Sequence, residues 1–180
     1  SALMVNTKTK ISYDISNQEF ESARFKSMLN SLKYLLIGRN NELLSFDKIK
    51  EDLGLRNQRY LGIQTVEVDS IVGSLDRYKD FDRFFLPKKA HLQARWAKIH
   101  NLMASDVILP PVKLYKVGDI YFVYDGNHRV SVAKKTGVKY IDAEVIEFVT
   151  DVPLTPDMDP NEIFILAERE KFFNLTKLDK

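Results

Sequence analysis

The chain has 180 residues, of which 44% are apolar and 11% are aromatic, so it can bury a sizeable core. It has no cysteine, which excludes disulfides, thiolate metal sites and cysteine nucleophiles from this sequence. Lys and Arg number 27 against 25 Asp and Glu, without the basic excess typical of strong nucleic-acid binders. The sequence contains neither a membrane-spanning apolar run nor a signal-peptide pattern, and we expect a soluble cytoplasmic protein.

The N-terminal part, residues 1–61, is predicted to be a helical extension. Residues 1–16 are polar and are expected to form an irregular arm. Apolar residues at spacings of three and four from Phe25 to Leu36 predict a helix with a buried stripe, ending at Gly38. Ser45 is expected to cap a second short helix that ends at Gly54. Whether this extension is a lid, a dimer face or a fixed brace is left open.

The central part, residues 62–148, is predicted to contain the sheet. A strand is expected from Gly62 to Val72, because its apolar residues are often β-branched. A long charged and aromatic loop follows, which must be held in place by burial of its phenylalanines. Pro87 is predicted to begin a helix with a basic outer face. Two strands joined by a turn at Gly118-Asp119, a helix ending at Gly137 and a third strand complete this region.

The last part, residues 149–180, is expected to be a proline-rich linker and a helix from about residue 161 to 174. This order of elements predicts an α+β fold with a small mixed sheet, flanked by N- and C-terminal helices. Glu67 and Asp69 fall on one face of the predicted strand and are interpreted as carboxylates facing water rather than Mg²⁺ ligands. No transition-metal site is predicted.

The most informative segment is the turn that begins at Asp125, where a strand-like run meets a helix. Gly126 permits a positive φ and a close approach of backbone to a ligand, and Asp125 or Asn127 can cap the helix. His128 and Arg129 fall in the first helical turn, where exposed N–H groups and the helix dipole attract anions. Because the guanidinium of Arg129 can also form bidentate hydrogen bonds with phosphate oxygens, the sequence predicts a phosphate-binding turn.

Two residues of this turn are candidate catalytic groups. His128 is a candidate acid or base near neutral pH, and Asp125 is a candidate base or metal ligand. Each has a plainer interpretation, since His128 can orient phosphate or bond a carbonyl and Asp125 can be a turn or capping residue. Arg77, in the long loop, is either a second phosphate contact or an arginine paired with Asp80 or Asp82. The whole segment can also be an ordinary strand–turn–helix corner.

Residues 63–147 resemble the ParB N-terminal/sulfiredoxin-like superfamily. The resemblance rests on the first strand, on Arg77 and Pro111, and on the Gly-x-His-Arg turn followed by a helix with Ala133 and Gly137. Members bind nucleotides: CTP in partition proteins, and ATP or ADP in sulfiredoxin and in an archaeal free-serine kinase. The resemblance implies the ParB/sulfiredoxin-like fold. It also implies that residues 126–129 hold nucleotide phosphates, with help from Arg77, and that Mg²⁺ accompanies a triphosphate.

The chain departs from these families at position 127. Asn127 stands where sulfiredoxin has its reactive cysteine and where partition proteins have a glutamate. Sulfinic-acid reduction by that route is therefore excluded, and CTP hydrolysis of the partition type is not expected. The flanking segments, residues 41–46, 71–81 and 172–179, resemble a subgroup of bacterial ParB-like proteins.

The expected function is nucleotide binding, with ATP, CTP or a diphosphate as ligand and with phosphoryl transfer or hydrolysis left open. A second hypothesis is a DNA-associated regulatory or nuclease-like module of the ParB type. It predicts a basic surface running from helix 88–100 to Lys134, Lys135 and Lys139. A third is a non-catalytic interaction domain in which Arg129 is engaged by an internal carboxylate. Homodimer formation is left open.

Overall fold

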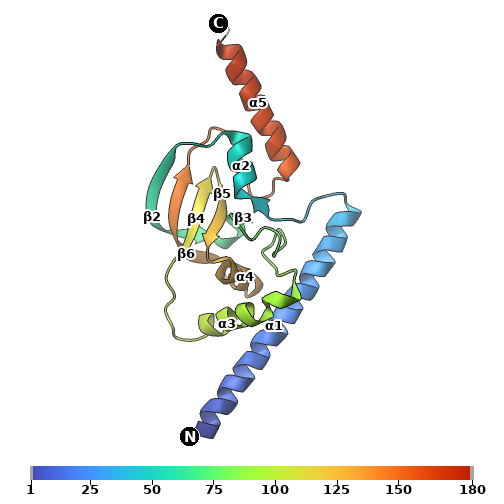
Figure 1. Ribbon diagram of the computed structural model, residues 1–180, viewed down its shortest axis with the longest axis vertical. Helices are drawn as coiled ribbons and strands as arrows, with labels where there is room; N and C mark the ends of the chain where they lie inside the picture. Colours follow the sequence, from blue (N-terminus) through green and yellow to red (C-terminus); the bar gives the residue numbers. More distant parts are fainter. Residues whose placement is uncertain (1, 179–180) are drawn as a thin grey trace.

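A six-stranded mixed sheet lies at the centre of the molecule (Figure 1), in a computed structural model that describes residues 2–178. Its strands are β1 (Leu44–Ser45), β2 (Gln58–Glu67), β3 (Ile71–Ser74), β4 (Val112–Val117), β5 (Ile120–Asp125) and β6 (Tyr140–Phe148). They lie in the order β1-β3-β5-β4-β6-β2. The pairs β4–β5 and β2–β6 are antiparallel and the other three pairs are parallel. The predicted α+β class with a small mixed sheet is confirmed.

Helices cover both faces of this sheet. They are α1 (Ala2–Leu36), α2 (Phe46–Leu53), α3 (Gln93–Met103), α4 (Asn127–Lys135) and α5 (Pro160–Leu178). In Figure 1, α4, α3 and α1 follow one another outward from one face, whereas α2 and the beginning of α5 lie at the other. The free parts of α1 and α5 extend away from the sheet in opposite directions. Among residues 2–178, no helix combines the length and the apolar character needed to cross a membrane.

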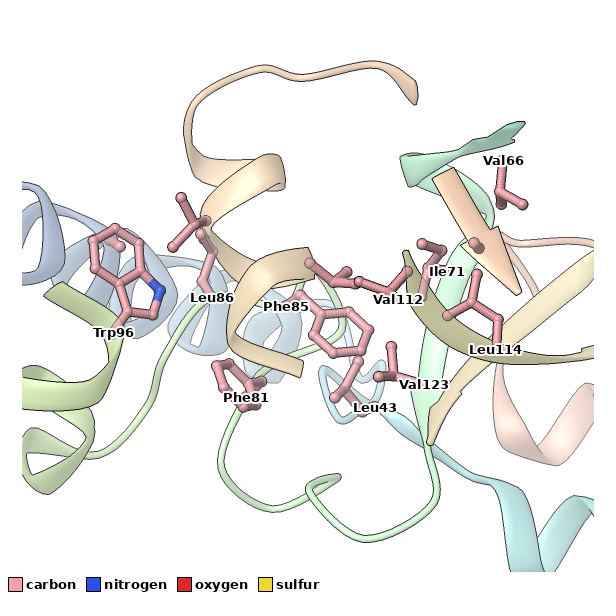
Figure 2. Close-up of a cluster of buried hydrophobic side chains, with 14 of the residues drawn as sticks. Leu43, Val66, Ile71, Phe81, Phe85, Leu86, Trp96, Val112, Leu114 and Val123 are labelled. Carbon is pink, nitrogen blue, oxygen red and sulfur yellow. The ribbon is translucent and has the colours of Figure 1, made fainter. Parts of the chain in front are cut away.

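The first core cluster fills the space between the sheet and the stack of α4, α3 and α1. Figure 2 shows Trp96 on one side of α4 and Ile71 and Leu114 on the sheet side. Trp96 is fully buried, and its indole Nε1 donates to Ser131 Oγ at 2.9 Å. The ring of Phe20 lies 5.7 Å from that of Trp96. These contacts connect α1, α3 and α4 to one another beneath the sheet.

The second core cluster lies on the opposite face, where Phe46 at the start of α2 contacts three aromatic rings of the sheet. The centroids of Tyr115, Phe148 and Phe122 are 4.6, 5.0 and 5.4 Å from that of Phe46. Ile163 of α5 is fully buried in the same cluster. Ser45 caps α2 by accepting a bond from Lys48 N, and Gly54 ends the helix in the left-handed conformation, as the sequence predicted.

Helix α1 differs from its prediction in two ways. Residues 2–16, predicted as an irregular arm, are helical, and Ser16 Oγ lies 2.8 Å from His100 Nδ1 of α3. The apolar stripe predicted to be buried is exposed, with side chains between 47% (Leu29) and 87% (Leu36) accessible. The buried face carries Ser16, Phe20, Ala23 and Ser27 instead. Three of these four side chains are small, so α3 can approach α1 closely there.

The strand predicted from Gly62 to Val72 is two strands separated by a 3₁₀ turn at Val68–Ser70. As a result β2 lies at one edge of the sheet while β3 lies inside it, and Glu67 and Asp69 do not share a strand face. The helix predicted from Pro87 begins only at Gln93, after a 3₁₀ turn at Ala90–Leu92. Pro87 instead pairs with Phe81 in an isolated bridge.

The long aromatic loop is held in place as predicted. Phe81 and Phe85 are fully buried, and Phe84 is 40% exposed. The buried carboxylate of Asp82 accepts bonds from the backbone N–H groups of Phe84 and Leu86, both at 2.9 Å. These bonds hold Phe85 at a φ of 57°, which a residue with a side chain rarely adopts.

The segment predicted as a linker after residue 148 packs against the sheet. Val152 and Leu154 are buried in the second cluster, and Leu154 O accepts a bond from Asp119 N in the β4–β5 turn. Residue 179, part of the C-terminal segment that resembles ParB-like proteins, lies outside the described residues. The predicted turn at Gly118-Asp119 is confirmed, with Gly118 at a φ of 59°.

Candidate functional site

The predicted phosphate-binding turn forms the junction between β5 and α4. Gly126 occupies the N-cap position at a φ of 111°, and no side chain caps the helix. The prediction that Asp125 or Asn127 caps it is therefore wrong. Asn127 Oδ1 accepts a bond from Ser74 Oγ at 2.8 Å, and the Asp125 side chain is 62% exposed. The first amide groups of α4 thus lack a side-chain partner, which leaves the helix N-terminus open to an anion.

Glycine is required at position 126 for two reasons. Its φ lies in a region that side chains rarely adopt. In addition, a Cβ atom would lie 2.7 Å from Val112 Cγ1 at the start of β4. The second reason follows from the β4–β5 pairing, which places Asp125 opposite Lys113. Backbone at this corner is therefore close to β4 on one side and accessible to a ligand on the other.

A cleft of about 240 Å³ lies in front of the turn. Besides residues 125–129 it is lined by Asp76, Arg95, Ile99 and Tyr124. Arg95 comes from α3, which packs against α4. The sequence placed Arg95 on the basic face of helix 88–100, which was considered for DNA binding and not for the phosphate turn. The basic face of this helix was the signal in the sequence that could have indicated an anion site. That α3 lies next to the turn follows only from the tertiary structure.

Arg129 is held against the start of β4. Its Nη1 donates to Pro110 O, and its Nη2 lies 3.6 Å from Asp125 Oδ2. The side chain is 13% exposed. Burial lowers the pKa of the guanidinium, and the charge of Asp125 opposes this effect. The interaction-domain hypothesis expects an internal carboxylate at Arg129, whereas the carboxylate found there, Asp125, is largely exposed.

His128 is buried behind the turn, with only 8% of its surface exposed. Its ring packs edge-on against Phe81 at 5.3 Å, and Nδ1 has no hydrogen-bond partner within the described residues. Burial lowers the pKa of His128 to about 4, and the positive charges of Arg95 and Arg77 contribute to this shift. The imidazole is therefore neutral at pH 7, when it can donate a hydrogen bond but is a weak base.

Arg77 lies beside the cleft and does not line it. Its Nη1 is 3.2 Å from Asp80 Oδ2, and Lys89 pairs with the other oxygen of Asp80 at 3.3 Å. The backbone N–H of Arg77 donates to Ser74 Oγ, the same hydroxyl that bonds Asn127. Arg77 is thus connected to the turn through its backbone, and its charge is near enough to influence His128.

The cleft offers two carboxylates to a metal ion. Within residues 2–178 there is no cluster of three or more His, Asp or Glu side chains arranged to hold a metal. Asp76 and Asp125 nevertheless both line the cleft. Mg²⁺ is commonly bound by one or two carboxylates together with substrate phosphates, so these two side chains are the candidate ligands if the predicted metal binds here.

The basic surface expected of a DNA-binding module is interrupted. Lys134 Nζ points inward and donates to Ile71 O at 2.8 Å. Lys135 Nζ pairs with Glu19 at 3.1 Å. On α3, His100 stacks on Trp96 with its ring 5.5 Å away. Lys134 and Lys135 are thus engaged within the protein, whereas Lys139 is exposed, and DNA binding stays a prediction.

Comparison with known proteins assigns this chain to no family. No protein-family model matches this sequence, and no curated protein matches it. Among solved structures, sulfiredoxin from Arabidopsis thaliana is similar with a TM-score of 0.35 and 18% sequence identity. The similarity covers 46% of this chain and 82% of that one. It concerns the fold alone, so membership of a ParB-like family and the roles of the site residues remain predictions.

Proposed function

We propose that the β5–α4 turn binds the phosphates of a nucleotide. The observation that supports this is the open N-terminus of α4, which has Gly126 as its cap and no capping side chain. The cleft in front of it is also lined by Arg95, Arg129 and the neutral imidazole of His128. Backbone amides, the helix dipole and guanidinium groups all favour a phosphate at this position.

The size of the cleft indicates how a nucleotide would lie. About 240 Å³ is below the roughly 300–1,000 Å³ typical of sites that enclose a small molecule. We therefore expect the phosphates to occupy the cleft and the nucleoside to extend out of it. Asp76 and Asp125 would share Mg²⁺ with the phosphate oxygens.

Phosphoryl transfer or hydrolysis is a further step of the same proposal. With a pKa of about 4, His128 is suited to donating a hydrogen bond to a phosphate oxygen rather than to accepting a proton. Asp125 is exposed at the edge of the cleft, where it is the candidate base or metal ligand. Any catalysis would rest on positioning and charge neutralisation, as in other phosphoryl transfers.

Calorimetric titration with ATP, ADP, CTP and GTP, each with and without Mg²⁺, tests the proposal. We expect saturable binding by the wild type and a loss of at least about tenfold in Arg129→Ala, the equivalent of ~1.4 kcal/mol. Arg59→Ala is the matched control, because Arg59 is a surface arginine paired with Glu147 on β6. Absence of binding by every nucleotide, or equal binding by Arg129→Ala, would contradict the proposal.

The interaction-domain hypothesis is the second candidate, and it is favoured because Arg129 is nearly buried and already donates to Pro110 O. In that case the arginine stabilises the corner, and the turn has no ligand. Arg129→Ala would then lower stability, and no nucleotide would bind to either protein. Thermal unfolding recorded alongside the titration distinguishes the two outcomes.

A further inference from the structure

A second pocket, of about 440 Å³, lies at the opposite end of α4 from the phosphate turn. It is bounded by the end of α1, the 3₁₀ turn at Val68–Ser70, the aromatic loop, the last turn of α4 and residues 156–159. It shares no lining residue with the cleft in front of the turn. Its volume falls within the range of small-molecule sites.

Two cations with little exposure line this pocket without a carboxylate partner. Lys134 Nζ donates to Ile71 O at 2.8 Å and lies 5.5 Å from the centre of the Phe85 ring. Arg83 Nη2 donates to the carbonyl oxygens of Pro156 and Met158, at 3.0 and 2.5 Å. Neither side chain forms an ion pair within the described residues. An anionic ligand would give these cations the direct ion pair that they do not form with the described residues.

Burial disfavours the charged form of both cations. It lowers the pKa of Lys134 to about 8 and that of Arg83 to about 10. The charges of Asp69 and Asp82 act in the opposite direction on Lys134, and that of Arg83 adds to the lowering. The buried ammonium has three N–H donors and one hydrogen-bonded protein acceptor. It therefore retains donors for a ligand.

The carboxylates around the pocket are already engaged or lie at its edge. Asp159 Oδ1 accepts from Asn161 N at the start of α5, and Asp157 Oδ1 accepts from Thr155 Oγ1. Asp69 and Asp157 are exposed. With Arg39, the lining holds three basic and three acidic residues. Asp159, which is partly buried, and Asp157 raise the pKa of Arg83. Because carboxylates surround the two cations, the pocket favours a ligand with a single small anionic head group over a polyphosphate.

An aromatic wall adjoins the charged part of the pocket. The rings of Tyr34 and Phe84 meet edge to face with centroids 5.9 Å apart, and both line the pocket together with Val72. Phe84 is the one phenylalanine of its loop that is not fully buried. Its neighbour Phe85 has the positive φ noted above, a type of strain that is frequent at ligand sites.

We propose that this pocket binds a small organic anion, whose charged carboxylate or phosphate group meets Lys134 and Arg83 and whose flat apolar part lies against Phe84 and Tyr34. The proposal concerns a different site from the nucleotide turn and does not depend on nucleotide binding.

Ligand-observed NMR and calorimetry with benzoate and phenyl phosphate test this proposal, with benzamide as the uncharged analogue. We expect at least one of the two anions to bind saturably to the wild type, with little or no binding of benzamide. The anion that binds more tightly shows whether the site prefers a carboxylate or a phosphate head group. In Lys134→Met, which keeps the apolar stem, affinity should fall by at least about tenfold. Lys135→Met is the matched control, since the neighbouring Lys135 pairs with Glu19 outside the pocket.

Nucleotide titration of Lys134→Met separates this site from the nucleotide turn, because Lys134 does not line that cleft and its replacement should leave nucleotide binding unchanged. Thermal unfolding adds a second readout, as a bound anion should raise the Tm of the wild type more than that of Lys134→Met. The proposal is overturned if neither anion binds at roughly 10 mM. Equal binding of benzamide, or undiminished binding by a folded Lys134→Met, overturns it as well.

Discussion

At the scale of single residues, the electrostatic environment of His128 follows from its neighbours in space. Burial against Phe81 disfavours the charged imidazolium, and Arg95 and Arg77 act in the same direction. A histidine in the first turn of a helix would ordinarily titrate near neutral pH. Here it stays neutral well below that range, which suits a hydrogen-bond donor in an anion site.

This shift predicts how stability depends on pH. The folded-state pKa of His128 is about 4, against an ordinary value of 6.5. Below pH 6.5 the unfolded chain takes up a proton that the folded protein does not. The contribution of His128 is therefore complete above pH 6.5 and lost as the pH falls towards 4, by up to about 3 kcal/mol.

Urea unfolding at pH 7 and at about pH 4.5 measures this effect. We expect the wild type to lose more free energy of unfolding between the two conditions than His128→Leu does. His91→Leu is the control, because His91 is exposed. If the wild type and His128→Leu show the same pH dependence, His128 does not have a depressed pKa in the folded protein.

At the scale of elements, the packing of α1, α3 and α4 positions residues of both proposed sites. Trp96 bonds Ser131 on α4 and packs against Phe20 on α1, so α3 connects the two other helices. This places Arg95 of α3 in front of the turn. The end of α1 then brings Tyr34 to the second pocket. Only the residues of α1 near Phe20 and Ala23 are buried in this stack.

Two phenylalanines on α1 therefore should differ greatly in their effect on stability. Phe20→Ala removes a fully buried ring and should lower the free energy of unfolding by about 3–5 kcal/mol. Phe25→Ala removes a ring that is 57% exposed and should change it by about 0.5 kcal/mol or less. Urea unfolding monitored by circular dichroism provides both values. A large loss in Phe25→Ala would mean that the apolar stripe of α1 is covered in solution.

At the scale of the whole molecule, the two core clusters share one sheet. The first cluster holds Trp96 and the second holds Phe46 and Ile163. β1 pairs with β3 and β2 pairs with β6, so two strands that begin before residue 62 form both edges of the sheet. The parts of the chain before residue 62 and after residue 148 thus pack on the central strands.

This arrangement predicts a single cooperative unfolding transition. Trp96 is the one tryptophan of the sequence and reports on the first cluster, whereas far-ultraviolet circular dichroism reports on all helices and strands. We expect the two signals to have the same midpoint in urea. An additional dichroism transition without a change in fluorescence would show that α2 and α5 unfold separately from the first cluster.

Several local features were correctly predicted from the sequence, because they depend on neighbours along the chain. Ser45 and Gly54 bound α2, Gly118 forms the β4–β5 turn, and Gly126 has a positive φ. The α+β class follows from the order of such elements. That a glycine turn leads directly into the N-terminus of a helix could likewise be predicted from the residues Asp125 to Arg129.

Only the tertiary structure decided which surfaces meet. The spacing of apolar residues defines a stripe on α1, but contact with α3 buries the face of Phe20 and leaves Leu29 exposed. The same packing brings Arg95 to the turn and places Lys134 in a second pocket. A periodic pattern shows which residues share a face of a helix. What that face contacts, and therefore the burial and charge environment of each side chain, depends on residues distant in the sequence.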